Sequence, residues 1–189
     1  MYRNFVKRIL DIIISGIALL CFCPIILVLI AILMIANKYS AFFAQERPGK
    51  DGKIFKLVKF KTMTDKTDSD GNLLPDDKRL TKIGAFIRST SLDELPQLWN
   101  VLKGDMSVVG PRPERPYFVD QFKQTIPKYM VKHQVRPGLT GWAQIHGCRG
   151  DTSIKKRIEY DIEYVENWHM GLDLGIMIKT TLKKNPNAY

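Results

Sequence analysis

Two adjacent carboxylates, Asp93 and Glu94, and an arginine between two prolines, Arg112, are the residues of this chain best suited to chemistry. Carboxylates hold divalent cations or act as nucleophiles, and a guanidinium group offers a two-pronged donor to a phosphate. Pro111 and Pro113 stiffen the backbone around Arg112. The pattern is typical of phosphate chemistry, although a generic proline-rich turn would also explain the arginine.

The elements that position the two carboxylates allow a second interpretation. Apolar residues recur at helical spacing in Leu95, Leu98, Trp99 and Leu102, which predicts a helix from Glu94 to Leu102 that ends at Gly104. Ser91 and Glu94 could then form a capping box, with the acids only complementing the helix dipole. Spacing alone favours this capping role. In the functional alternative, the helix N-terminus attracts a phosphate and the carboxylates hold Mg²⁺ beside it.

The charge of the chain indicates an anionic partner. The net charge is +10 and the sequence pI is about 9.5. Nucleic acid, anionic lipid and a phosphorylated substrate all fit such a charge, but no nucleic-acid-binding motif, P-loop or dinucleotide fingerprint is present. The three cysteines form no CxxC pair and the three histidines share no close spacing, which argues against a zinc site and a Ser-His-Asp triad.

The N-terminal segment is long and apolar enough for a membrane. Ile12 to Ala36 carries no charge, and a helical span needs about 20 residues, whereas the apolar core of a signal peptide has about 7–15. Pro24 lies near its middle, where proline kinks a helix. Basic residues flank both ends: Arg3, Lys7 and Arg8 before it, and Lys38, Arg47, Lys50 and Lys53 after it. A re-entrant hairpin with both ends on the cytoplasmic face and an ordinary kinked anchor receive equal weight.

The remaining chain predicts a single α+β domain that is mainly helical. β-Prone stretches at Ala41–Gln45 and Ile54–Phe60 flank two turn dipeptides and predict a hairpin, whose Lys59 and Lys61 either line a phosphate site or are merely solvated. Thr64 to Lys78 predicts a surface loop, since a calcium loop would place Lys66 at its first ligand position. The chain thus divides into an apolar segment over residues 1–38 and a compact domain over residues 39–189.

Amphipathic helices are predicted in the rest of that domain. The segments are Leu80–Arg88, Tyr117–His133 and helices within Lys155–Lys184. Tyr117–His133 combines aromatic residues with lysines, a composition that suits either core packing or a helix in the lipid headgroup region.

Several motifs together resemble the bacterial sugar transferases, the monotopic phosphoglycosyl transferase family. The matching stretches include Lys7-Arg8-x-x-Asp11, Gln45–Gly49, Lys59–Met63, Arg79–Gly84, Ser91–Ser107, Gly110–Pro113, Arg136–Gln144 and Asp161-x-x-Tyr164–Trp168. They run almost end to end in the order of the family, in its minimal form. Two positions depart from its common pattern: Cys23 stands where serine is frequent before the proline, and Lys61 stands where arginine is frequent.

The resemblance implies a Mg²⁺-dependent enzyme on the cytoplasmic face of the inner membrane, with a re-entrant membrane helix over residues 1–38 and a membrane-associated catalytic domain over residues 39–189. It would move a sugar-1-phosphate from a UDP-sugar to polyprenyl phosphate and release UMP, the first membrane step of glycan assembly. Asp93 would be the nucleophile of a covalent aspartyl phosphosugar, Glu94 would lie beside the metal and phosphate, and Cys23-Pro24 would mark the helix break. The predicted phosphate-binding residues are Lys59, Lys61, Arg88, Arg112 and Arg136.

The expected partners are therefore a UDP-sugar, polyprenyl phosphate and membrane lipids, but no nucleic acid; a homodimer stays open. Two other functions compete with this one. The first is direct transfer of the sugar with release of UDP. The second is a basic membrane scaffold without catalysis.

Overall fold

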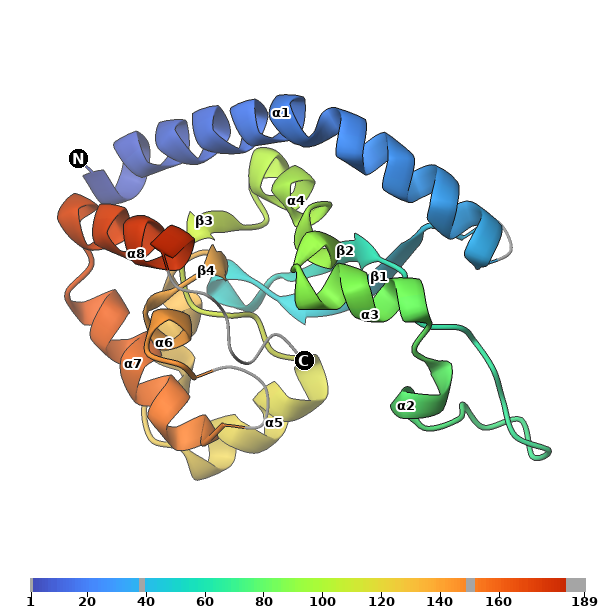
Figure 1. Ribbon diagram of the computed structural model, residues 1–189. Helices are drawn as coiled ribbons and strands as arrows, with labels where there is room; N and C mark the ends of the chain where they lie inside the picture. Colours follow the sequence, from blue (N-terminus) through green and yellow to red (C-terminus); the bar gives the residue numbers. More distant parts are fainter. Residues whose placement is uncertain (1, 38–39, 149–151, 183–189) are drawn as a thin grey trace.

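The computed structural model describes residues 2–37, 40–148 and 152–182, in which helices surround two small sheets (Figure 1). In chain order the elements are η1 (Tyr2–Val6), α1 (Lys7–Ala36), β1 (Phe42–Pro48), η2 (Lys50–Gly52), β2 (Ile54–Phe60), α2 (Asp76–Arg79), α3 (Lys82–Ser89), η3 (Leu92–Glu94), α4 (Gln97–Lys103), β3 (Ser107–Val109), α5 (Pro116–Thr125), η4 (Tyr129–Gln134), β4 (Gly138–Thr140), α6 (Trp142–Ile145), α7 (Ile154–Glu166) and α8 (Met170–Leu182). The expected domain boundary at residue 38 lies outside the described residues.

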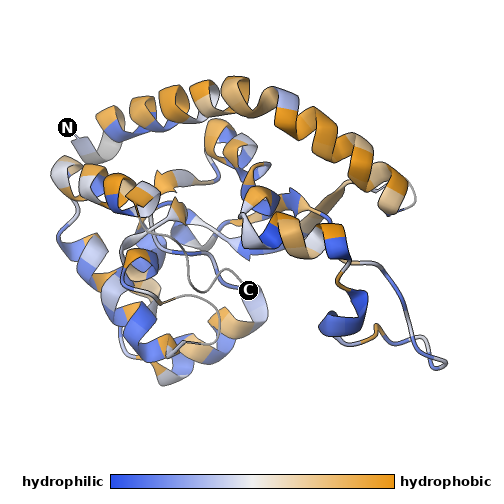
Figure 2. Ribbon diagram, in the orientation of Figure 1, coloured by the Kyte–Doolittle hydropathy of each residue, from blue (hydrophilic) through white to orange (hydrophobic). Residues whose placement is uncertain are grey.

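The apolar segment forms one continuous helix, α1, of 30 residues that contains Pro24. The break expected at Cys23-Pro24 is therefore absent. Proline removes one backbone hydrogen bond, but its fixed φ is compatible with a helix. A helix with long helical segments on both sides of a proline therefore bends at that residue and does not end there. Figure 1 shows α1 as an arc across the domain, and Figure 2 shows that it is apolar along most of its length. The helix is long and apolar enough to cross a membrane.

Both ends of α1 pack against the rest of the protein, whereas its centre is exposed. Near the C-terminal end, Leu29 and Leu33 are buried in a cluster with Ala41, Phe60 and Ile87, against which Leu92 and Leu95 also pack. In the centre, Leu20 is 77% exposed. This distribution gives the helix two anchor points on one domain.

Polar contacts fix the N-terminal end of α1. Arg8 donates from Nη1 and Nη2 to the carbonyl oxygens of Val101 and Leu102, at 2.6 Å each. Asp11, which is buried, accepts hydrogen bonds at 2.9 Å from Ser107 Oγ and the Val108 backbone N–H. The same turn of α1 thus holds the end of α4 and the strand β3.

The predicted hairpin is confirmed, with β1 and β2 antiparallel in a register that pairs Phe42 with Phe60 and Pro48 with Ile54. Side chains alternate across a sheet, so Gln45 and Arg47 lie on the same face as Lys59. The parallel pair β3–β4 was not expected from sequence because each strand has only three residues. Its neighbourhood is tight: a Cβ on Gly110 would lie 2.4 Å from the carbonyl oxygen of Arg136.

The helix expected from Glu94 to Leu102 differs in the structure. Residues Leu92–Glu94 form the 3₁₀ turn η3, and α4 begins only at Gln97. Pro96 has no N–H to donate back to Leu92, so the α-helical pattern cannot extend through it. Ser91 has a φ of 58° and makes no side-chain cap hydrogen bond, so the capping box is not formed. Gly104 ends α4 with a φ of 101°, as predicted.

The remaining predictions are largely confirmed. The surface loop expected at Thr64–Lys78 is present up to residue 75, where α2 follows, and Asp68 Oδ1 stabilises it by accepting from the N–H groups of Asp70 and Asn72. The segment Tyr117–His133 is split into α5 and η4 around Pro127. In the C-terminal half, α7 and α8 pack with β3 around Val109, Tyr164 and Ile176.

Candidate active site

A cleft of about 660 Å³ lies beside the hairpin and gathers most of the chemistry-bearing residues. One wall is the hairpin face with Gln45, Arg47 and Lys59, a second is η3 with the start of α4, and a third is the loop from Arg112 to Arg115. Its other lining residues are Phe43, Leu57, Phe60, Lys61, Thr62, Met63, Asp65, Asp76, Arg79, Arg88, Ser91, Asp93, Glu94, Gln97, Phe118 and Arg157.

Three elements converge on the carboxylate pair. Glu94 Oε1 accepts from Lys59 Nζ of β2 at 2.9 Å and from Arg112 Nη2 of the loop after β3 at 2.8 Å. Asp93 Oδ2 lies 3.6 Å from the same Lys59 Nζ. The arrangement makes Glu94 the acceptor that holds both cations in place, while Asp93 makes no hydrogen bond within the described part of the chain.

The two carboxylates have opposite pKa shifts. Burial raises the pKa of Asp93, and the negative charge of Glu94 adds to this effect, although Lys59 partly offsets it. Burial also disfavours ionisation of Glu94, but the cations Arg112 and Lys59 outweigh it and hold the pKa of Glu94 far below its ordinary value. Glu94 is thus a fixed anion, whereas Asp93 is the more basic carboxylate of the pair.

We predict that Lys59→Gln raises the pKa of Asp93 further, because the substitution removes the largest influence that favours the ionised form. Titration of the Asp93 carboxyl carbon by NMR measures the change. Lys56→Gln is the matched control, since Lys56 lies on the same strand but does not line the cleft. An Asp93 pKa that is equal in both variants would contradict the assigned coupling.

The structure brings four of the five predicted phosphate-binding residues into the cleft. Lys59, Lys61, Arg88 and Arg112 line it. Lys61 pairs with Asp65, and Arg88 Nε donates to Thr62 Oγ1 at 2.9 Å.

Arg136 is placed elsewhere. It does not line the cleft, and its Nε donates to the carbonyl oxygen of Gly104 at 2.8 Å. The end of α4 leaves carbonyl groups without helical partners, and a cation near a helix C-terminus is favourable. Arg136 and Arg8 therefore stabilise the end of α4, and a phosphate-binding role for Arg136 is not supported.

Other cleft residues were missed by the sequence analysis, among them Arg47, Arg79, Arg115 and Arg157. The alternation of the hairpin could have revealed Arg47, because it lies on the same face as Lys59. Nothing local in the sequence marks Arg157, which reaches the cleft from α7, far along the chain.

The carboxylate pair fits a metal ion only in part. Among the described residues, no three His, Cys, Asp or Glu side chains group closely enough to hold a metal ion. Two adjacent carboxylates do suit Mg²⁺, which commonly takes its remaining ligands from substrate phosphates and water. Asp93 and Glu94 are thus consistent with an ion that the substrate helps to hold. Cys23, on the exposed centre of α1, takes no part in the cleft.

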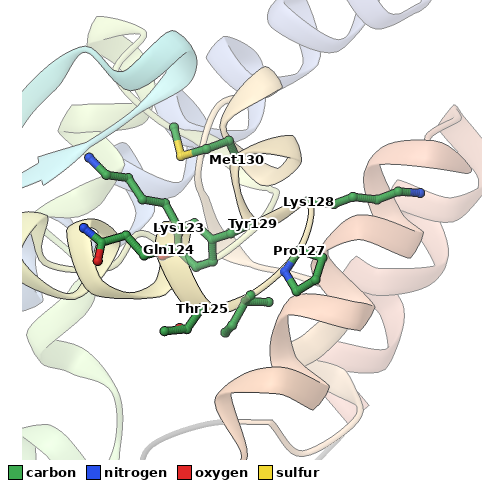
Figure 3. A pocket seen from close by; sticks show the side chains of 8 residues that line it. Lys123, Gln124, Thr125, Pro127, Lys128, Tyr129 and Met130 are labelled. Atoms are coloured by element: carbon green, nitrogen blue, oxygen red, sulfur yellow. The ribbon is translucent and has the colours of Figure 1, made fainter.

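A second cavity, of about 290 Å³, is lined by residues Lys123 to Met130 between α5 and η4. It shares no residue with the cleft. Figure 3 shows that Lys123 and Lys128 point in opposite directions, so their charges do not converge on one ligand. The cavity is therefore a weak candidate for phosphate binding.

Comparison with known proteins shows to which family this chain belongs. A family model described as "Bacterial sugar transferase" matches residues 2–185. The "Uncharacterized sugar transferase EpsL" of Bacillus subtilis (strain 168) is 50% identical over 177 residues, which cover 94% of this chain and 86% of that protein.

Two longer relatives have names that state a reaction. The "UDP-glucose:undecaprenyl-phosphate glucose-1-phosphate transferase" of Klebsiella pneumoniae is 46% identical, with 97% of this chain and 41% of that protein covered. The "UDP-N-acetylgalactosamine-undecaprenyl-phosphate N-acetylgalactosaminephosphotransferase" of Aeromonas hydrophila is 42% identical, with 93% and 43% covered. The chain thus spans about two fifths of these two relatives.

These matches confirm the predicted resemblance and the predicted class of enzyme, a phosphoglycosyl transferase. They extend over nearly the whole chain, from the membrane-length helix α1 through the cleft to α8. The chain belongs to the bacterial sugar transferase family.

Proposed function

We propose that this protein transfers a sugar-1-phosphate from a UDP-sugar to polyprenyl phosphate and releases UMP, as the first membrane step of glycan assembly. The observation that carries the proposal is the carboxylate pair: Asp93, with a raised pKa, lies beside Glu94, which holds Lys59 and Arg112 at the cleft. The names of the relatives from Klebsiella pneumoniae and Aeromonas hydrophila support the substrate classes.

In the first step of the proposed reaction, an Asp93 carboxylate oxygen attacks the phosphorus that bears the sugar. A bond forms between that oxygen and the phosphorus, and the bond from the phosphorus to the bridging oxygen of the diphosphate breaks. The electron pair stays on the bridging oxygen, which leaves as part of UMP. Lys59 and Arg112 lie where they can neutralise the charge that collects on the transferred phosphate.

In the second step, a phosphate oxygen of the polyprenyl phosphate attacks the same phosphorus. The bond to Asp93 breaks, its electron pair returns to the carboxylate, and the lipid diphosphate sugar is released. One phosphate site then serves donor and acceptor in turn, which corresponds to ping-pong kinetics.

We assign Mg²⁺ as the cofactor of this chemistry. Asp93 and Glu94 would hold it together with the substrate diphosphate, and the ion would supply charge neutralisation at the phosphate oxygens. Removal of Mg²⁺ with EDTA is expected to stop UMP release, and Mg²⁺ added back should restore it.

The packing of α1 supports a re-entrant arrangement with both ends at the cytoplasmic face of the inner membrane. A straight 30-residue helix is about 45 Å long. If α1 crossed the membrane, its two ends would lie on opposite sides of the bilayer. Yet Arg8 at one end and Leu33 at the other both contact the same domain. A helix that enters the membrane with its exposed centre around Pro24 and returns satisfies both contacts.

Exposed apolar residues beside α1 suit the lipid interface. Ile83 and Phe86 of α3 and Trp99 of α4 are 42%, 62% and 61% exposed, and both helices lie near α1 in Figure 1. The sequence analysis considered the segment Tyr117–His133 for this role, but α5 lies on the far side of the domain from α1. We therefore propose α3 and α4 as the interfacial helices.

The decisive experiment incubates the membrane-embedded protein with polyprenyl phosphate and a panel of UDP-sugars, and identifies the nucleotide released. The panel includes UDP-glucose and UDP-N-acetylgalactosamine because relatives named for both sugars match at 46% and 42% identity. UMP is the expected product. UDP would indicate direct sugar transfer, and lipid binding without nucleotide release would favour the scaffold.

Thiol labelling tests the topology. Cys21, Cys23 and Cys148 are first replaced by alanine, and single cysteines are then placed at each end of α1. Re-entry predicts that an impermeant reagent reaches both ends from the same face of the membrane. Labelling from opposite faces would rule out re-entry without affecting the proposed reaction.

A further inference from the structure

The end of the cleft between β1, α5 and α7 carries an excess of positive charge. Arg47 of β1, Arg115 just before α5 and Arg157 of α7 line it, with Glu114 as the single carboxylate among them. Three guanidinium groups and one carboxylate leave a formal net charge of +2. Arg157 Nη1 donates to Glu114 Oε1 at 2.6 Å, so this carboxylate is already engaged.

The rest of the cleft is closer to neutral. Lys59 and Arg112 face Asp93 and Glu94. Lys61 and Arg79 are likewise paired, with Asp65 and with Asp76. With Arg88 included, this part of the cleft holds five cations and four carboxylates, a formal net charge of +1, so the larger excess lies at the end with Arg47, Arg115 and Arg157.

Arg47 lies at the centre of this excess. Its Nη2 donates to Gln45 Oε1 at 2.7 Å and its Nη1 donates to the carbonyl oxygen of Pro113 at 3.3 Å, whereas its buried Nε has no hydrogen-bond partner in the described structure. Burial and the nearby cations Arg115 and Arg112 lower the pKa of Arg47 to about 10, against the opposing effect of Glu114. An arriving anion would relieve this repulsion.

The position of the cluster indicates which anion it receives. In Figure 1, α5 and the start of α7 lie on the side of the domain away from α1, which arches over the opposite side. A lipid-linked acceptor arrives from the side of α1, whereas a water-soluble nucleotide can enter from the far side. Arg115 lies only three residues after Arg112, which contacts Glu94, so the two phosphates of one diphosphate could occupy neighbouring positions.

We propose that Arg47, Arg115 and Arg157 form a subsite for the nucleotide-side phosphate of the donor, the group that leaves as a nucleoside monophosphate. This assignment rests on the proposed function. A phosphate monoester carries a charge of about −1.5 to −2 at pH 7, which matches the excess at this end of the cleft. The subsite would stabilise the negative charge that grows on the bridging oxygen as its bond to the transferred phosphorus breaks.

Binding of UMP to the full-length protein in lipid nanodiscs tests the proposal without turnover. Arg115→Gln should weaken UMP binding about tenfold, as expected for loss of one charge-assisted contact. Glu114→Gln should strengthen binding by about threefold, because it removes the only negative charge of the cluster while keeping an acceptor for Arg157. Lys123→Gln is the matched control: it removes a cation from α5 outside the cleft and should change nothing.

The opposite signs separate an electrostatic subsite from a structural role. If Glu114→Gln weakens UMP binding as much as Arg115→Gln does, the cluster only maintains the fold of the loop. Equal UMP affinity in all variants would also overturn the assignment.

The half-reactions provide a second readout. Arg115→Gln should slow formation of the covalent intermediate at least as much as its discharge by polyprenyl phosphate, because the acceptor phosphate reaches the same site only after UMP has left. The reverse result would assign the cluster to the acceptor. Release of UDP by the unmodified protein would refute the proposed function instead, so the two failures can be distinguished.

Discussion

Asp93→Asn is expected to abolish UMP release, with a loss of at least about 10³-fold in the rate of the first half-reaction. An amide oxygen is a poor nucleophile, and no other carboxylate at the cleft combines a raised pKa with a position beside Lys59 and Glu94. Rapid quenching after mixing with the active UDP-sugar measures UMP and the covalent phosphosugar together. Retention of either product would remove Asp93 from the proposed role.

The same substitution is expected to stabilise the protein. The folded state raises the pKa of Asp93, so above the ordinary aspartate pKa the ionised carboxylate costs stability, and this cost vanishes as the pH falls below that range. A neutral amide removes the cost at pH 7 and should raise the unfolding temperature by about 2–4 °C, which corresponds to about 1 kcal/mol for a chain of this size. Asp77→Asn, an exposed aspartate outside the cleft, is the control and should have no effect.

Glu94→Gln is expected to have the opposite effect on stability. Lys59 and Arg112 hold the pKa of Glu94 below its ordinary value, so its contribution is fully present at neutral pH and is lost only as the pH falls through that lowered pKa. Removal of the charge leaves two partly buried cations without their shared acceptor, at a cost of about 2 kcal/mol. Thermal unfolding at pH 7 should therefore occur about 4–8 °C lower.

Catalysis should also fall in Glu94→Gln, by about 100-fold, because Lys59 and Arg112 are no longer held against the phosphate site. Glu46→Gln is the matched control, as it neutralises an exposed glutamate of β1 that does not line the cleft. A stable and active Glu94→Gln protein would show that the ion pairs do not organise the site.

The sequence was sufficient to select several residues that lie together at the cleft. Asp93, Glu94 and Arg112 were selected as chemistry-bearing residues, and the structure brings all three together. The hairpin and the helix end at Gly104 were also predictable, because turn dipeptides and a left-handed glycine are local signals.

What the sequence did not predict depends on contacts between distant segments. An arginine such as Arg136 can bind either a phosphate or a backbone carbonyl, and its charge does not distinguish the two. Only the tertiary fold shows that Arg136 donates to the carbonyl of Gly104. The capping box failed because Pro96 shifts the start of α4 and leaves Ser91 in a left-handed conformation. Arg157 became part of the cleft through its pairing with Glu114, 43 residues earlier in the chain.

The way α1 is held limits how this enzyme could be re-engineered. Arg8 and Asp11 brace the end of α4 and the strand that leads to Arg112, while Leu29 and Leu33 share a cluster with Leu92 and Leu95, which flank Asp93 and Glu94. A hybrid in which a foreign anchor replaces α1 would be expected to reach the bilayer, but it would lose the contacts that position the proposed catalytic residues. In this chain the helix that would attach the protein to the membrane also supports the cleft, so we expect that replacing the helix would disturb the cleft as well.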